Sequence, residues 1–125
     1  MSTFWFLEYF LSIRIMKIYQ TEFLGEDCNI CGIGDASPLK IARAMTDKVL
    51  DNEKLHYHIK GHEYYIFIRG VARICVGTSK INLSAGQMLY IEPGEVHKIE
   101  EILEPSDYVV INTNPDPKDK VVLEQ

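Results

Sequence analysis

The sequence predicts an all-β protein with antiparallel strands in a single domain. Short segments rich in aromatic and β-branched residues alternate with turn signals such as Ser84-Ala85-Gly86 and Pro93-Gly94. No segment shows the apolar periodicity of a long amphipathic helix. Regular short strands between turns are typical of a sandwich or a barrel. A chain of 125 residues is long enough for one domain with one sizeable core.

The expected strands follow one another between residues 17 and 113. Gly70 and Gly77 separate strands in the middle of the chain, and the turns at 84–86 and 93–94 bound the strand between them. The expected strands are 17–24, 39–46, 54–59, 63–69, 71–77, 79–83, 87–92, 96–102 and 107–113. We therefore expect three parts: an apolar extension at 1–16, the β-domain at 17–113, and a tail at 114–125. Residues 113–120 form a polar, proline-bearing exit, and the tail after them either is loose or pairs with another strand.

The composition excludes some classes of function. A net charge of −5 and a pI near 5.3 argue against non-specific nucleic-acid binding, which needs a basic face. A hydrophobic content of 46% with 25% charged residues is ordinary for a globular protein. Gly32-Ile33-Gly34 looks like a glycine loop, but Asp35-Ala36-Ser37-Pro38 follows where a helix would have to start. We therefore expect no phosphate loop there.

The first residues form an unusually apolar segment. Phe4-Trp5-Phe6-Leu7 and Tyr9-Phe10-Leu11 are too short to span a membrane, and Glu8 and Arg14 interrupt the segment. It also lacks the basic start and the cleavage site of a signal peptide. Three interpretations are open: an element that docks on the barrel or on a second subunit, an extension ahead of a natural start at Met16, or a contact with a membrane surface.

The three cysteines are Cys28, Cys31 and Cys75. An odd number without a signal peptide indicates a reducing compartment, so we expect the protein in the cytoplasm. Cys28 and Cys31 form an isolated CxxC pair. Zinc would need a second pair or nearby histidines, and a redox role would favour a position at a helix start. We expect two ordinary thiols in a loop or strand, with a metal or redox role as the alternative.

Three of the four histidines belong to a set of residues suited to binding a divalent metal. His56 and His58 are two positions apart, Glu63 follows five residues later, and His97 comes after the Pro93-Gly94 turn. Neutral imidazole suits iron, nickel, copper and zinc, and a carboxylate adds a hard oxygen and a negative charge. The pattern indicates a metal site.

The spacing has a mechanical basis in strand geometry. Side chains alternate between the two faces of a strand, so His56 and His58 share a face if 54–59 is extended. Gly61 permits a turn, after which either His62 or Glu63 can return beside the two histidines. Alternation favours one of these two residues and leaves the choice open.

Two segments resemble the two motifs of the cupin superfamily. His56-x-His58-x4-Glu63-x6-Gly70 matches the first motif, and Gly86 to His97, with a Pro-Gly turn between them, resembles the second. Pro93 stands one place later than in the commonest form of the second motif. Glu101 stands where an asparagine often follows the histidine. Neither change affects a presumed ligand.

The resemblance implies an antiparallel double-stranded β-helix, the jelly-roll or cupin barrel, with one metal inside. The family spacing selects Glu63 over His62 as the carboxylate ligand, beside His56, His58 and His97. Three imidazoles and one carboxylate leave two open positions on an octahedral ion, as a catalytic site requires. The cofactor we expect is one divalent ion: iron, manganese, nickel or zinc.

Strand alternation suggests further residues of the pocket. Tyr65 and Phe67 share a face with Glu63 and would form an aromatic wall. Tyr65 is the candidate catalytic acid or base, with plain core packing as the alternative for both residues. Arg43, on the strand 39–46, is a candidate substrate anchor because its guanidinium can hold a carboxylate or phosphate with two hydrogen bonds. The alternative is an exposed arginine.

Three functions compete. The first is a metal-dependent enzyme that acts on a small polar metabolite, of the dioxygenase or sugar/organic-acid isomerase type. The second is a non-catalytic module that binds or senses a sugar or another metabolite, and the third is a structural dimer. We expect a small-molecule ligand, no nucleic-acid or membrane partner, and a homodimer, since cupins of this size resemble one another in pairing and the apolar N-terminus favours an interface.

Overall fold

The computed structural model describes residues 18–23, 28–31, 37–51 and 53–124. In that part of the chain the regular structure is almost entirely antiparallel β, as the sequence predicts. The elements in chain order are β1 (Glu22–Phe23), β2 (Cys28–Cys31), β3 (Lys40–Thr46), β4 (His56–His58), β5 (Glu63–Val76), β6 (Ser79–Ser84), β7 (Met88–Ile91), β8 (His97–Asn112), the 3-10 helix η1 (Pro117–Asp119) and β9 (Lys120–Val122).

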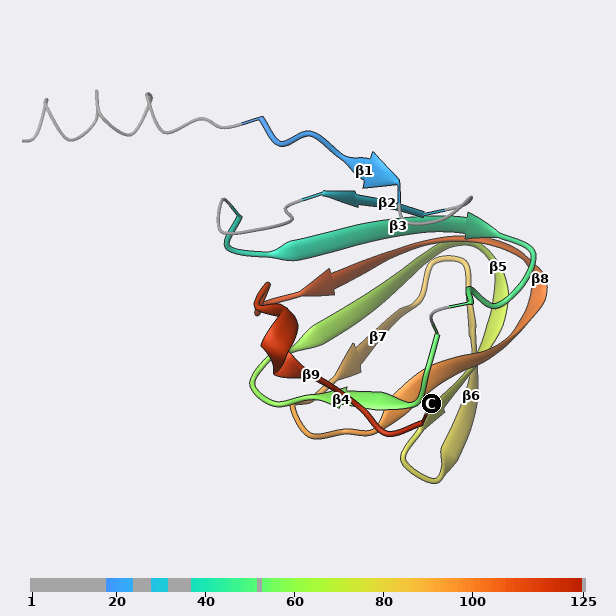
Figure 1. Cartoon of the computed structure of the whole chain (residues 1–125). Helices are drawn as coiled ribbons and strands as arrows, with labels where there is room; N and C mark the ends of the chain where they lie inside the picture. The colour runs from blue at the N-terminus through green and yellow to red at the C-terminus, as the bar shows by residue number, and fades with distance from the viewer. Residues whose placement is uncertain (1–17, 24–27, 32–36, 52, 125) are drawn as a thin grey trace, which may run out of the picture.

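Two long strands, β5 and β8, connect the two walls of the barrel. They pair with each other over most of their length. One end of the pair belongs to a wall with the order β1-β2-β3-β8-β5-β7, and the other end belongs to a wall that contains β9, β4 and β6. In Figure 1, β3 lies on one side of the molecule, β4 and β9 lie on the other, and β5 and β8 curve between them.

The core fills the space between these walls. Its buried apolar side chains come mainly from β5 and β8, with contributions from β3, β6 and β7. They alternate with outward-facing positions along each strand, which is the pattern that burial on one face imposes. The core residues are Ala44, Tyr65, Phe67, Ala72, Ile74, Leu83, Ile91, Ile99 and Tyr108.

Gly70 does not end a strand. The separate strands expected at 63–69 and 71–77 are one strand, and so are those expected at 96–102 and 107–113. The pairing of β5 with β8 shifts register around Gly70, whose φ is 87°. Such a bulge bends the ladder without breaking it, so the glycine turns the strand from one wall to the other.

Part of the segment after residue 113 pairs with the barrel. Of the two alternatives left open for it, pairing is the one observed, because β9 pairs with β4. The apolar extension at 1–16, the Gly32-Ile33-Gly34 loop and the cysteine side chains of β2 lie outside the described residues. The backbone of the CxxC pair is a strand, so the helix start that would favour a redox role is not present there.

Gly70 and Gly86 offer a matched test of the bulge. A Cβ on Gly70 would meet the backbone carbonyl of Pro105, whereas a Cβ on Gly86, with a similar φ of 85°, would meet nothing within 4 Å. Gly86→Ala should lower the free energy of unfolding by about 1 kcal/mol, the cost of a left-handed residue. Gly70→Ala should lower it by about 3 kcal/mol, because backbone must also move. Urea unfolding of both variants measures the difference, and equal losses would show that the close approach at Gly70 is unimportant.

Candidate metal centre

Strand geometry places His56, His58, Glu63 and His97 around one point. In β4 the two histidines face inward, at 4% and 9% exposure, while Tyr57 between them faces the other way. Glu63 is the first residue of β5 and is 5% exposed. His97 is the first residue of β8, is fully buried, and is the direct cross-strand neighbour of His56. The positions of these residues in the paired strands therefore bring the four side chains together.

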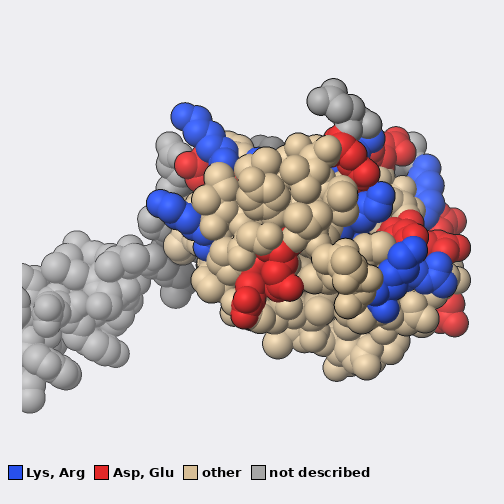
Figure 2. Space-filling view, turned by 90° about the horizontal axis from the view of Figure 1, so that it is seen from below, with Lys and Arg blue, Asp and Glu red and all other residues tan. Residues whose placement is uncertain are grey.

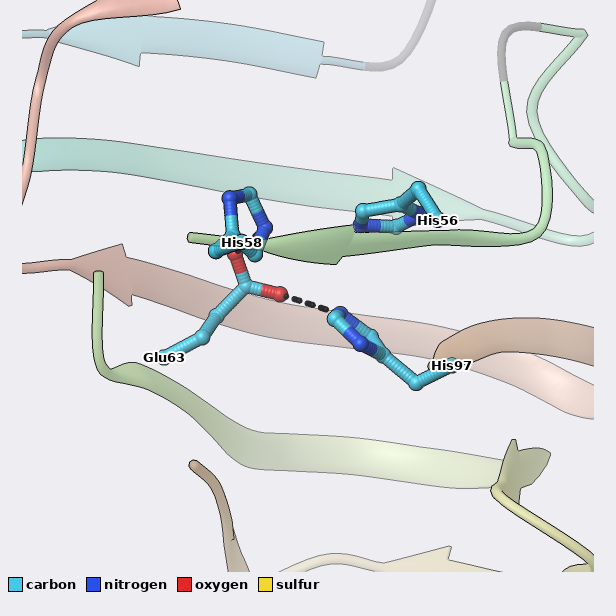
Figure 3. Close-up of side chains that lie close together, drawn as sticks. All are labelled: His56, His58, Glu63 and His97. Carbon is cyan, nitrogen blue, oxygen red and sulfur yellow. Dashed lines mark hydrogen bonds and ion pairs between the residues drawn. The ribbon is translucent and has the colours of Figure 1, made fainter. Parts of the chain in front are cut away.

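The ligand atoms of these four side chains lie within 4.8 Å of one another. Figure 3 shows the Glu63 carboxylate between the rings of His58 and His97. Oε1 of Glu63 lies 2.9 Å from Nε2 of His97, and Oε2 lies 2.9 Å from Nε2 of His58. The rings of His56 and His97 are 4.2 Å apart between centroids.

The other ring nitrogen of each histidine faces an acceptor outside the cluster. Nδ1 of His56 lies 2.6 Å from the carbonyl oxygen of Lys54, and Nδ1 of His97 lies 2.9 Å from that of Glu95. Nδ1 of His58 faces a carboxylate oxygen of Asp119 at 3.7 Å. An Nδ1–H that donates to a carbonyl leaves the lone pair on Nε2, and a metal ligand needs this tautomer.

Nε2 of His58 provides a direct test of whether the cluster fits a metal. It is buried and has no hydrogen-bond partner among the described residues, since its short contact with Glu63 lacks the geometry of a hydrogen bond. A buried polar atom without a partner costs free energy, and such atoms are rare in folded proteins. A divalent cation between the imidazoles and the carboxylate would satisfy it, so the four residues fit the ion that the resemblance implies.

The charges of the cluster suit a metal at neutral pH. Burial alone would raise the pKa of Glu63, but the contacts with His58 and His97 outweigh it and hold that pKa well below its usual range. Burial lowers the pKa of His56 to about 4, so this ring is neutral. Burial also acts to lower the pKa of His97, but the Glu63 carboxylate outweighs it and raises that pKa. A cation would compete with a proton for Nε2 of His97.

Residues outside the sequence-predicted set lie around the cluster. Nδ2 of Asn112 donates to Oε2 of Glu63 at 3.1 Å. Glu53 accepts a 2.8 Å hydrogen bond from the backbone N–H of Ile99, and burial raises its pKa. Asn112 and Asp119 lie at or beyond the end of the expected β-domain. Only their amide and carboxylate chemistry could have pointed to them, and many polar residues of the chain share it.

The cluster opens into a cavity of about 260 Å³. His56, His58 and Glu63 line its inner end, and Lys40, Asp116 and Lys120, which are all exposed, line it as well. Apolar side chains form most of the remaining wall. They are Ala42, Ala44, Leu50, Tyr65, Ile99, Tyr108, Val110 and Pro117. A small ligand with polar groups fits such a cavity better than an extended polymer does.

Tyr65 lies in this wall and is 3% exposed. Burial raises the pKa of its hydroxyl well above 10, and the charge of Glu63 adds to this effect. The hydroxyl therefore keeps its proton at neutral pH and acts as a donor. Phe67 is not in the wall: it is 1% exposed, and its ring stacks on Tyr108 with 4.9 Å between centroids. Phe67 therefore packs in the core, which was the alternative to its place in the cavity wall.

Arg43 faces away from the cavity. Its neighbours on β3, Ala42 and Ala44, line the cavity, and alternation turns the Arg43 side chain to the outer face. There it holds both carboxylate oxygens of Asp107, at 3.0 and 2.7 Å. His62 is also outside the cluster: it is exposed, and its Nδ1 lies 2.6 Å from the hydroxyl of Tyr90. The fold brings Glu63, and not His62, to the histidines.

A family model identifies the protein family to which this chain belongs. The family model described as Cupin domain matches residues 50–113, which is half of the chain. The chain is a cupin. The match includes all four residues of the cluster and ends just after Asn112. A search of the curated proteins found no significant match.

Solved structures with the same fold include proteins of different activities. Streptomyces Pac13 with uridine has a TM-score of 0.67 and 11% identity, with 87% of this chain and 91% of that chain covered. Pac13 is described as a unique nucleoside dehydratase. Bacillus subtilis oxalate decarboxylase has a TM-score of 0.63 and 16% identity, with 84% of this chain but only 30% of that chain covered. KdgF from Halomonas sp. has a TM-score of 0.61 and 16% identity, with 80% and 89% covered. At these identities the likeness shows the fold alone.

Proposed function

We propose that this cupin binds one divalent metal ion through His56, His58, Glu63 and His97 and acts with it on a small polar metabolite. The observation that carries the proposal is the buried cluster itself, with each Nδ1 directed outward and with Nε2 of His58 lacking a hydrogen-bond partner among the described residues. Iron, manganese, nickel and zinc all suit three imidazoles and one carboxylate. The reaction that we propose is of the dioxygenase or the sugar/organic-acid isomerase type.

The bound ion would supply Lewis acidity and an open position for an oxygen ligand. The residues of the chain would bind the ligand, move protons and exclude water. Tyr65, whose hydroxyl keeps its proton, would donate a hydrogen bond to an oxygen of the ligand beside Glu63. Glu53, at the cavity wall, has a raised pKa and is the second group that could move a proton. The apolar wall would exclude water from the ligand.

The alternative is a non-catalytic module that binds or senses a metabolite in the same cavity. The activities named for the similar structures differ from one another, so fold alone does not choose between catalysis and binding. No helix in the described part of the chain is long and apolar enough to span a membrane. The face shown in Figure 2 carries small groups of both charges, with no broad basic surface. A cytoplasmic location remains our prediction.

The first test is the metal content of the protein, purified without a chelator or a histidine tag. We expect about one ion per chain in the natural sequence and none in the His56→Ala/His58→Ala double variant, because two of the four ligands are then missing. His62→Ala is the matched control: it removes an exposed histidine outside the cluster and should leave the metal content unchanged.

Elemental analysis by mass spectrometry measures the number of metal ions per chain in all three proteins. If the natural chain contains no metal even after reconstitution with iron, manganese, nickel or zinc, the enzyme proposal fails. If the metal stays in the double variant, the ligands are elsewhere. A metal-loaded protein that binds metabolites without forming product would favour the binding module.

We also propose a homodimer that forms through the outer face of the wall β3-β8-β5-β7. In an exposed antiparallel sheet, outward positions are usually polar. Here they form two apolar rows: Tyr64 is paired with Tyr90 and Ile111, and Ile66 is paired with Met88 and Val109. Met88 is 60% exposed and Ile68, at the end of the rows, is 53% exposed. Single chains rarely leave such a patch uncovered.

The charges of this outer face favour a second copy of the chain as its partner. The chain carries a net charge of −5, so two copies repel each other over most orientations. On this face Arg43 and Asp107 neutralise each other through a bidentate pair. This pair therefore adds no net charge to the face, and sheets can pack face to face at about 10 Å.

Met88→Lys should convert the dimer into a monomer, because it places a charge within one of the two apolar rows of the interface. Leu103→Lys, at a residue that is 37% exposed and is not in the two rows, is the control and should remain dimeric. Light scattering after size-exclusion chromatography distinguishes 14.4 kDa from twice that mass. A monomeric natural chain, or a Met88→Lys dimer, would refute this interface. Loss of the dimer only on deletion of residues 1–15 would assign it to the N-terminal segment.

A further inference from the structure

The C-terminal segment lies directly beside the strand that carries two of the proposed ligands. In β9, Lys120 pairs with His58 and Val122 pairs with His56. Two backbone hydrogen bonds extend this contact: the N–H of Ile59 donates to the carbonyl of Asp119 at 2.9 Å, and the N–H of Leu123 donates to that of Leu55 at 2.9 Å. The position of β4, and with it that of both histidines, therefore depends on residues after 113.

Within this segment, the side chain of Asp119, at the end of η1, faces the site. Its side chain is buried, and both of its oxygens accept hydrogen bonds from the turn that follows His58. Oδ1 accepts from the N–H of Lys60 at 2.8 Å, and Oδ2 accepts from the N–H of Gly61 at 3.0 Å. The same Oδ2 lies 3.7 Å from Nδ1 of His58. One carboxylate thus holds the turn and faces the ligand ring.

Gly61 is required for this close approach. A Cβ at residue 61 would lie 2.7 Å from Oδ2 of Asp119 and would also meet the amide oxygen of Asn112. Asn112 in turn donates to Glu63. The turn between the second and third ligands is therefore packed on both sides by residues that touch the cluster, and a side chain at 61 would displace one of them.

We infer that Asp119 is a positioning residue for the metal site. It fixes the 59–61 turn with two hydrogen bonds and places a negative charge opposite Nδ1 of His58. A carboxylate in that position favours the tautomer with the proton on Nδ1, which leaves the Nε2 lone pair for the ion. The inference rests on the proposed metal site, and it extends that site beyond the residues that match the family model.

The contacts of Asp119 distinguish it from an ordinary structural carboxylate. Asparagine at 119 could accept one of the two backbone hydrogen bonds, but its NH2 group would oppose either an N–H of the turn or Nδ1–H of His58. The change removes one charge and one acceptor while keeping the volume. It should therefore weaken the binding of the ion more than it disturbs the fold.

The experiment compares Asp119→Asn with Asp116→Asn. Asp116 is in the same segment and lines the cavity, but its carboxylate is exposed and caps η1 by accepting from the N–H of Lys118. The affinity for Co²⁺ and Zn²⁺ is measured by competition with a chromophoric chelator, after circular dichroism has shown that each metal-free variant is folded. The absorption spectrum of the Co²⁺ complex reports ligand geometry, which a loss of stability alone would leave unchanged.

We expect Asp119→Asn to bind both ions about 10- to 100-fold more weakly than the natural chain, as other changes to groups behind a ligand do. Its Co²⁺ spectrum should also change. Asp116→Asn should match the natural chain in both measurements. If Asp119→Asn does not fold, Asp119→Glu is measured instead. It keeps the charge but displaces the carboxylate, so it should also weaken the binding of both ions.

The possible failures can be told apart. A natural chain that binds neither ion contradicts the proposed metal site, and this inference falls with it. A natural chain that binds, together with an Asp119 variant of equal affinity and identical spectrum, overturns the inference alone. Equal losses in the Asp119 and Asp116 variants overturn it as well, because the effect would then belong to the segment and not to the carboxylate that faces His58.

Discussion

One buried carboxylate, that of Glu63, organises the centre of this barrel. Taking a charged group out of water is costly unless opposite charge or hydrogen bonds replace the water. Here the side chains of His97 and Asn112 contact the two carboxylate oxygens, and Nε2 of His58 lies 2.9 Å from one of them. The arrangement needs Glu63 at the start of β5 and His97 beside β4. The pairing of β5 with β8 sets Glu63 opposite Asn112, and the pairing of β4 with β8 sets His97 opposite His56. The strand pairing of the barrel therefore assembles the cluster.

Much of this centre could be predicted from the sequence, because the spacing of the ligands within short segments follows from local strand and turn geometry. Alternation places His56 and His58 on one face, a turn at Gly61 returns the chain beside them, and the Pro93-Gly94 turn precedes His97. The choice between His62 and Glu63 needed the resemblance. Alternation also located Tyr65 in the cavity wall, since it shares a face with Glu63. The same rule could not distinguish wall from core for Phe67, because both lie inside the barrel.

Long-range partners could not be predicted. Arg43 was a candidate substrate anchor with an exposed arginine as the alternative, and neither interpretation included Asp107, which is 64 positions away and holds its guanidinium on the outer face. Asp119 and Asn112 contact the site only because β9 returns to β4 and because β8 ends beside Glu63. We expected Gly70 to separate two strands, whereas the register shift that makes it a bulge depends on the partner strand. Each of these contacts depends on which distant strands pair with one another. A single sequence does not show that pairing.

The measurement that tests the central claim most directly is a crystal structure of the metal-loaded protein with anomalous scattering at the absorption edge of the bound metal. We predict one anomalous peak per chain, about 2.0 to 2.3 Å from Nε2 of His56, His58 and His97 and from one oxygen of Glu63. A loaded protein with its peak elsewhere, such as at Cys28 and Cys31, or with no peak among these four residues, would contradict the account.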